Sequence, residues 1–483
     1  MLGDISFKRI DEEKDDLIRL ARKIWENPEQ GNREFIASDA CTELLEKAGF
    51  EVERDYGGLP TALRAVYGSG HPVIGLLGEF DALPGLSQKD VCYRDPVVEG
   101  GWGHGCGHCL MCSANIGALI ALRDEMEAKK LKGTIVFYAC PAEETVGGKG
   151  AMASGGAFKE LDIALCWHPG KFNRSSYSLL TGANSQIFKF YGKSAHAACD
   201  PQLGRSALDA VELMNTGVQY LREHAIQEAR IHYAITNTGG YSPNVVQPFA
   251  EVLYLIRAPK NDQVKELFER VNDIARGAAL MTGTRMEMQF VKACSNVVDN
   301  TVLEEVLQKN LEEVEREPYT EAELEFAKKL AGTYGAGELD VQDLLKRYEK
   351  SRKAEVEAFL NAHKDDVICD YIVPLKDTET VMAGSTDVGD VSWVCPTAQI
   401  NAVTEAAGTP GHSWQQVSQG KSSIAHKGML FAGKVMAGAI IDVLEDQRLI
   451  GEAKDELKKR VGEAGYVAPI PKDVRPMAIN PKK

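Results

Sequence analysis

Continuously apolar runs alternate, along the first third of the chain, with segments in which apolar residues recur at helical spacing. Leu17, Leu20 and Ile24 follow the period of a helix, whereas VIGLLGE is apolar throughout, as in a strand buried on both faces. This alternation predicts an α/β fold with an open, mostly parallel sheet flanked by helices. The predicted helices are Asp11–Asn27, Asn32–Ala48 and Leu110–Glu127, and the predicted strands are Thr61–Tyr67, Val73–Glu79, Gly133–Cys140 and Leu161–Trp167.

A second pattern begins near Asn184. The order strand, helix, strand, strand, helix, strand predicts an inserted ferredoxin-like βαββαβ domain. We therefore expect two domains, one discontinuous over 1–183 and 294–483 and the other over 184–293, since 483 residues exceed one ordinary core. The segments of the insert are Gln186–Gly192, Arg205–Glu223, Ile231–Thr238, Ala250–Arg257, Asp262–Met281 and Arg285–Val291.

The C-terminal third contains three contrasting stretches. Residues 302–364 are helical in pattern and highly charged, which predicts a solvated helical excursion. Lys427–Leu444 is a strongly apolar helix that we expect to pack on the sheet of the first domain. Pro469–Lys483 contains four prolines and is expected to be a tail.

Composition narrows the classes of partner and the compartment. The formal net charge of −15 argues against nucleic acid or an anionic membrane as a partner. The acidic, amphipathic N-terminus lacks the apolar core of a signal peptide, and no run is long enough to span a membrane. The eleven cysteines are scattered, many of them in apolar segments, which is typical of reduced thiols. We expect a cytoplasmic protein.

A glycine-rich loop, GWGHGCGH over Gly101–His108, holds the first candidate ligands. Its four glycines allow tight turns and close approach of the backbone to a ligand. Cys106 and His108 are both ligand types for first-row metal ions. The alternative is a glycine loop with one buried cysteine and one hydrogen-bonded histidine, and these eight residues do not separate the two interpretations.

Further ligand-type residues follow the predicted buried strands, at the sheet edge where open α/β folds place their sites. Val73–Glu79 ends with the carboxylate of Glu79 and is followed closely by that of Asp81. Glu143 and Glu144 follow the predicted strand Gly133–Cys140, and His168 follows Leu161–Trp167. Each residue alone has an ordinary explanation, because such groups are often only solvated or hydrogen-bonded. Together with Cys106, His108 and a C-terminal histidine, either His412 or His426, they match the inventory of a two-metal hydrolytic site.

The ordered motifs GHGCGH, PAEE, WHPG, GKSAHAA and HSWQQ resemble the metal-dependent amidohydrolase and exopeptidase family. That family includes hippurate hydrolases, auxin-conjugate hydrolases and carboxypeptidase G-type enzymes. The resemblance covers nearly the whole chain and implies a zinc-exopeptidase-like catalytic domain with two divalent metal ions, Zn or Mn. It implies that Cys106 is the bridging ligand and that Glu143 is the general base. The four terminal ligands implied by the resemblance are His108, Glu144, His168 and His412. The family places its last ligand in a loop before the final helix, which favours His412 over His426.

The inserted domain resembles the lid and dimerisation domain of that family. His196 in GKSAHAA matches a histidine that stabilises the developing oxyanion, although a turn histidine capping the strand is the alternative. Asn244 and Arg257 match lid positions that hold a substrate carboxylate, for which arginine is suited. Cys109 is a departure, because the amidohydrolase branch usually has Asp or Asn at that position, and its role is left open.

The resemblance implies a dinuclear metal-dependent amidohydrolase that cleaves the amide bond of N-acyl amino acids. Expected substrates are p-aminobenzoyl-glutamate and related aryl-amide or dipeptide-like compounds, with water activated by the metals and Glu143 as general base. We expect a homodimer through the lid domain or a heteromer with a related chain. One alternative is a partner-dependent or non-catalytic binding subunit of a hydrolase complex. Another is a thiol hydrolase with Cys106 as nucleophile, favoured by a helix N-terminus but opposed by the adjacent carboxylates.

Overall fold

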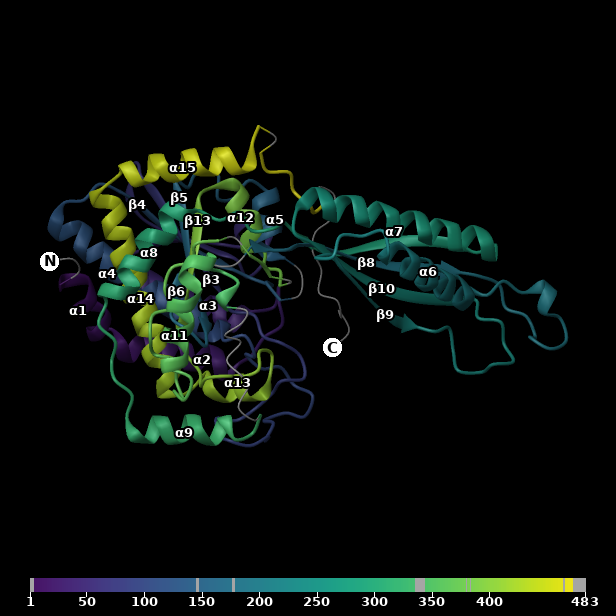
Figure 1. The fold of residues 1–483 in the computed structure, drawn as a ribbon, viewed down its shortest axis with the longest axis horizontal. Coiled ribbons are helices and arrows are strands. Elements are labelled where there is room, and N and C mark those ends of the chain that lie inside the picture. Colours follow the sequence, from purple (N-terminus) through teal and green to yellow (C-terminus); the bar gives the residue numbers. More distant parts are fainter. Residues whose placement is uncertain are drawn as a thin grey trace. The chain divides into compact units, whose positions relative to one another are not determined.

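The computed structural model describes residues 4–144, 147–175, 179–334, 344–378, 380–382, 384–463 and 465–471 (Figure 1). These residues form two compact units: unit 1 within 1–178, 298–380 and 391–467, and unit 2 within 179–297, 381–390 and 468–483. Residues 335–343 of the charged stretch and most of the expected tail Pro469–Lys483 lie outside the described residues.

Unit 1 is built on a seven-stranded sheet in which four neighbouring strands, β4, β3, β5 and β13, run parallel. The remaining strands pair antiparallel at the two sides. This confirms the α/β fold with a mainly parallel sheet. Across the sheet the strands are β1 (Glu51–Arg54), β2 (Leu63–Ser69), β4 (Gly133–Cys140), β3 (Val73–Glu79), β5 (Ile163–Gly170), β13 (Thr397–Val403) and β6 (Arg174–Ser175).

The predicted strands fall within this sheet, but one of its central strands was not predicted. β3 and β4 have the predicted bounds, and β5 extends past Trp167 to include His168. β13 is buried along its whole length, although Gln399 and Asn401 interrupt its apolar pattern. The polar side chain of Asn401 is accommodated because its amide donates to the His168 carbonyl at 3.3 Å and accepts from Arg174.

Helices α4 and α14 pack against each other and on the central strands, so the apolar C-terminal helix returns to the sheet as expected. The predicted helix Asp11–Asn27 corresponds mainly to α2, and a separate helix, α1, precedes it and ends at Glu12. Among the described residues, no helix is long and apolar enough to cross a membrane. The α-helices that do not belong to the insert are α1 (Asp4–Glu12), α2 (Lys14–Glu26), α3 (Phe35–Lys47), α4 (Met111–Lys129), α5 (Gly148–Ser154), α8 (Thr301–Glu313), α9 (Glu321–Ala331), α11 (Lys350–Ala362), α12 (Val388–Val394), α13 (Trp414–Gln419), α14 (Ser423–Glu445) and α15 (Arg448–Val461).

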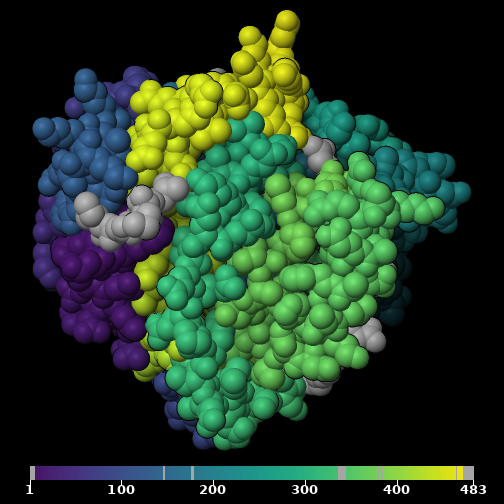
Figure 2. All heavy atoms as spheres, turned by 60° about the vertical axis from the view of Figure 1, so that its left-hand side comes forward, coloured from purple at the N-terminus to yellow at the C-terminus, as the bar shows by residue number. Residues whose placement is uncertain are grey.

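The prediction of a solvated excursion over 302–364 is wrong for its first helix. α8 buries Leu303, Leu307 and Leu311 completely and packs on β13, β6 and α14. In Figure 2 this teal segment lies beside the yellow C-terminal helices, where the Asn300 side chain donates to the Ala453 carbonyl at 2.9 Å. Later residues of the stretch form a small core of their own with Tyr348, Val356, Leu360 and Tyr371 among its members. The charged residues that dominate the pattern lie on the outer faces of these helices, so the pattern did not reveal their buried faces.

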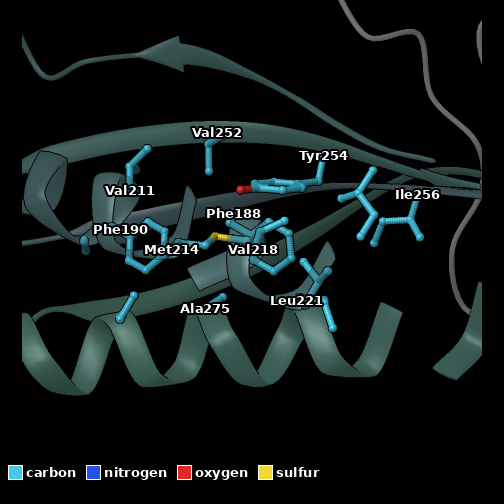
Figure 3. Packing of buried hydrophobic residues seen from close by; sticks show 14 of the residues in the cluster. Phe188, Phe190, Val211, Met214, Val218, Leu221, Val252, Tyr254, Ile256 and Ala275 are labelled. Atoms are coloured by element: carbon cyan, nitrogen blue, oxygen red, sulfur yellow. The ribbon is translucent and has the colours of Figure 1, made fainter. Parts of the chain in front are cut away.

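Unit 2 has the predicted βαββαβ order. Its four strands form an antiparallel sheet in the order β11-β8-β10-β9, with α6 and α7 packed against it. Figure 3 shows Phe188, Val252 and Met214 packed in the layer between strands and helices. The elements are β8 (Gly182–Tyr191), α6 (Ala207–Arg222), β9 (Arg230–Asn237), β10 (Phe249–Ala258), α7 (Asn261–Thr282) and β11 (Arg285–Cys294), with a short parallel pair of β7 (Leu179–Leu180) and β12 (Val381–Met382).

Candidate metal centre

The glycine loop passes close under neighbouring backbone before it enters the short 3-10 helix His108–Leu110 and then α4. Gly107 has a φ of 77°, in the left-handed region that favours glycine. A Cβ atom at Gly103 would lie 2.3 Å from the Leu86 carbonyl oxygen, so that position also requires glycine. The loop is therefore fixed in shape and presents Cys106 and His108 at the carboxyl end of the parallel strands.

His108 is fully buried and oriented by the end of β3. Its Nδ1 donates a hydrogen bond to Asp81 Oδ1 at 3.0 Å. Its Nε2 lies 3.0 Å from Glu79 Oε2 but makes no hydrogen bond. A buried ring nitrogen without a hydrogen-bond partner costs free energy unless it binds something else. This nitrogen fits a metal ion, with the Asp81 contact fixing the ring as metal-site partners commonly do.

His168 is oriented in the same manner. Its Nδ1 donates to the Pro169 carbonyl at 2.7 Å, and its Nε2 lies 3.4 Å from the Cys106 sulfur. Burial lowers the pKa of His168 to about 4. The ring is therefore neutral at pH 7, with a lone pair on Nε2 available to a cation.

Two groups of potential ligands share Cys106. The first is Cys106, His108 and His168, and the second is Cys106, Glu144 and His412; within each group the ligand atoms lie within 4.8 Å of one another. Thiol, imidazole and carboxylate together suit zinc and other first-row divalent ions. Burial and the negative charge of Glu144 raise the pKa of the Cys106 thiol far above its usual range. A free thiolate nucleophile at this position is therefore disfavoured unless a cation stabilises it.

His412 reaches the second group because its loop is anchored to the glycine loop. Its backbone N–H donates to the Gly105 carbonyl at 3.1 Å and to Gln416 Oε1 at 2.9 Å, and its Nε2 lies 3.5 Å from Glu144 Oε1. The competing histidine, His426, is buried within α14 and belongs to none of the ligand groups found among the described residues.

The segment after β4 carries the paired glutamates. Glu143 forms a third group with His108 and Glu79, again with ligand atoms within 4.8 Å. The backbone N–H of Glu144 donates to Asp81 Oδ2 at 2.9 Å. The two adjacent glutamates thus take part in different groups.

A buried ion pair at this centre was not predicted as part of the site. Lys149, in α5, lies with its Nζ 2.5 Å from Glu79 Oε1, and both side chains are buried. Burial by itself raises the pKa of a carboxyl group, but the charge of Lys149 lowers that of Glu79 to about 2. Glu79 and Asp81 were visible as carboxylates at a strand end, whereas nothing in the pattern around Lys149 indicated burial.

His104, within the loop, and Cys109, just after it, have ordinary partners. Cys109 is fully buried, and its thiol approaches the Gly107 carbonyl at 3.9 Å. His104 has its Nε2 3.1 Å from the Ile24 carbonyl. Neither belongs to a ligand group among the described residues, and both pack where the loop meets its surrounding helices.

The three candidate residues of the insert lie in unit 2. His196 is exposed, and its Nδ1 accepts the backbone N–H groups of Ala198 and Cys199 at 3.2 and 3.1 Å. A ring that accepts at Nδ1 carries its proton on Nε2 when neutral. Asn244 is adjacent, since its carbonyl accepts the Ala197 N–H at 2.9 Å. Arg257 lies on β10, opposite Arg230 of β9.

Comparison with known proteins identifies the family. The model of peptidase family M20/M25/M40 matches residues 75–442. One of the subunits of p-aminobenzoyl-glutamate hydrolase from Escherichia coli (strain K12) is 45% identical over 95% of both chains. The Xaa-Arg dipeptidase of Mus musculus is 33% identical over 61% of this chain and 68% of that protein.

A solved structure supports the fold. A dinuclear metal-binding peptidase of the M20 family from Bacillus subtilis has a TM-score of 0.56 and 18% identity, covering 90% of this chain and 99% of that one. The sequence match extends through both units, and the resemblance drawn from the ordered motifs is confirmed. The chain is thus a hydrolase that belongs to peptidase family M20/M25/M40.

Proposed function

We propose that the chain is a dinuclear metal-dependent amidohydrolase that cleaves the amide bond of N-acyl amino acids. The observation that carries the proposal is the position of Cys106, shared by two ligand groups and next to the glutamate pair. The name of the E. coli relative suggests p-aminobenzoyl-glutamate as the first substrate to try.

The proposed ligands divide into the two groups that share Cys106, with His108 and His168 on one side and Glu144 and His412 on the other. When bound, two divalent ions polarise the scissile carbonyl and lower the pKa of water. We propose Zn or Mn, since the donor set of sulfur, nitrogen and oxygen accommodates either.

Glu143 is the proposed general base. It lies beside His108 without being needed in either group that shares Cys106. Its carboxylate takes a proton from the attacking water as the new C–O bond forms. It then returns that proton to the leaving amine nitrogen as the C–N bond breaks, so that no external acid is required.

The second unit is proposed as the lid domain, with the insert over 184–293 as its sequence. His196, protonated on Nε2 when neutral, can donate to a developing oxyanion, a contribution of ~3 kcal/mol for one well-placed donor. Asn244 and Arg257 are proposed to hold the substrate carboxylate, for which a guanidinium provides two parallel donors.

Metal analysis of the purified protein, beside Cys106→Ser and Glu143→Ala, tests these assignments. Wild type is expected to hold about two metal ions per chain and to release p-aminobenzoate. Cys106→Ser is expected to lose most of its metal because Cys106 belongs to both groups. Glu143→Ala is expected to retain metal and lose turnover. Normal turnover by Glu143→Ala would refute its role as base.

Assembly is proposed as a homodimer through unit 2. β9 is an edge strand of its sheet, and Tyr233 and Ile235 on it are exposed, so a second copy can pair with its backbone. A heteromer is the second candidate, because the name of the E. coli relative describes one subunit of a hydrolase. Light scattering of the protein alone tests for the homodimer. Activity measured with and without a related hydrolase chain tests for the heteromer and for a partner-dependent binding subunit.

We propose a cytoplasmic location. All eleven cysteines are thiols rather than disulfides, and Cys199 is exposed, which is typical of a reducing compartment. Fractionation of the source cells with antibody detection tests this; recovery outside the cytoplasm would refute it.

A further inference from the structure

A buried carboxyl group at the start of α3 contacts the segment that carries the glutamate pair. This group belongs to Glu34, which is completely buried. Its Oε1 accepts the backbone N–H of Ala142 at 2.8 Å, and its Oε2 accepts the Thr61 hydroxyl at 2.6 Å. Glu34 belongs to none of the ligand groups found among the described residues.

The backbone that Glu34 holds is conformationally unusual. Ala142 is buried and has a φ of 60°, in the left-handed region that a residue with a Cβ rarely occupies. Its carbonyl accepts the N–H of Gly147 at 2.9 Å. Such a conformation persists only where surrounding contacts maintain it, and the Glu34 hydrogen bond is one of them.

Glu143 is consequently placed between two backbone amides that are each held by a buried carboxyl group. Glu34 holds the N–H of Ala142, and Asp81 holds the N–H of Glu144. The second oxygen of Asp81 accepts from His108 Nδ1 at 3.0 Å. The position of Glu143 relative to the ligand histidine is therefore set from both sides through backbone amides.

We propose that Glu34 is a positioning residue for hydrolysis, which fixes Glu143 through the backbone of Ala142. The proposal rests on the proposed function of Glu143 as general base. Glu34 does not touch the reacting atoms, and its effect is on the distance between a base and the proton it must take. An error of about 1 Å in such a distance costs on the order of 100-fold in rate.

Two substitutions separate positioning from simple bulk. In Glu34→Gln the amide oxygen can still accept from Ala142 and the NH2 group can donate to Thr61. Burial and the charge of Asp81 raise the pKa of Glu34 to about 8, so glutamine also resembles the neutral form of this carboxyl. Glu34→Leu keeps the volume but removes both acceptors.

The expected result is a selective loss in kcat. Glu34→Leu should lose on the order of 100-fold in kcat, with KM and metal content within about threefold of wild type. Glu34→Gln should stay within about threefold of wild type in kcat, KM and metal content. A Glu34→Leu protein with wild-type kcat, or a Glu34→Gln protein as slow as Glu34→Leu, would overturn the proposal, as would loss of metal in proportion to activity.

Hydrogen exchange provides a reading that does not depend on substrate. Mass spectrometry of a peptide over 133–144 should show faster exchange in Glu34→Leu but not in Glu34→Gln, with a Thr61→Val protein between them. Unchanged exchange in Glu34→Leu would overturn the proposal even if activity fell. If Glu34→Leu does not fold, Thr61→Val, which removes one hydrogen bond of Glu34, takes its place: faster exchange over 133–144 with a lower kcat is expected, and unchanged values of both would overturn the proposal.

Failure of the underlying function is recognised separately. Wild type and Glu143→Ala are measured in parallel: equal rates would reject Glu143 as base, whereas the exchange data would still report whether Glu34 holds the segment.

Discussion

Replacement of Lys149 by methionine tests how strongly the centre depends on its buried ion pair. Lys149 is fully buried and Glu79 is 2% exposed, with 2.5 Å between Nζ and Oε1. Methionine fills a similar volume but leaves the Glu79 carboxylate without the ammonium group. Removing one partner of a buried pair costs about 3–5 kcal/mol, because the remaining charge stays out of water.

The magnitude can be stated as a shift in melting temperature. Unfolding entropy of ~2.1 cal/mol/K per residue, over roughly 340 residues of unit 1, converts that cost to a decrease of about 4–7 °C. Calorimetry in the presence of a chelator is the appropriate assay, because a bound ion would add its own stabilisation.

Two controls make the test specific. Arg19 pairs with Asp16 at the surface and is 73% exposed, so Arg19→Met should change the melting temperature by less than about 1 °C. Glu79→Gln combined with Lys149→Met removes both charges and should recover at least half of the loss. A single variant as stable as wild type, or a double variant no more stable than the single one, would refute the reasoning.

Three further predictions concern the last ligand, a buried carboxyl group and the edge of unit 2. His412→Ala should lose about one of two metal ions while His426→Ala retains both, as measured by elemental analysis; the reverse pattern would return the last ligand to His426. Burial raises the pKa of Glu405 to about 8, so the folded state favours its neutral form. The contribution of this group to the free energy of unfolding is therefore fully present below pH 4.5 and is lost as pH rises toward 8. Glu405→Gln should therefore gain stability relative to wild type across that window, by at most about 1.4 kcal/mol per pH unit, and a constant difference in calorimetry would contradict this. Tyr233→Lys on β9 should shift the protein toward monomer in light scattering, and an unchanged mass would argue against pairing at this edge.

The sequence determined the elements whose signals are local. Continuous apolar runs placed β3 and β4 at their observed bounds, and the alternation of strand and helix patterns predicted the βαββαβ order of unit 2. β13 was not predicted because Gln399 and Asn401 are polar residues, which are unfavourable in a buried strand without hydrogen-bond partners. The partners of Asn401 come from β5 and β6 rather than from its own segment. Likewise, the charged pattern of α8 did not reveal the neighbours that cover its leucines.

The candidate site divides in the same way. Cys106 and His108 could be named as candidates because they lie in a glycine-rich motif, and Glu143, Glu144 and His168 because they follow recognisable strands. The family resemblance already favoured His412 over His426, and the tertiary structure adds that the backbone of His412 is tied to the glycine loop and its Nε2 lies near Glu144.

The supporting residues could be found only in the folded chain. Lys149 is 70 residues from Glu79, and Glu34 is 108 residues from Ala142. A lysine among glycines, or a glutamate in a polar segment, carries no local sign of burial, because its partner is supplied by another element. Local pattern determined which groups can do chemistry, and long-range packing decided which carboxyl and ammonium groups hold them in place.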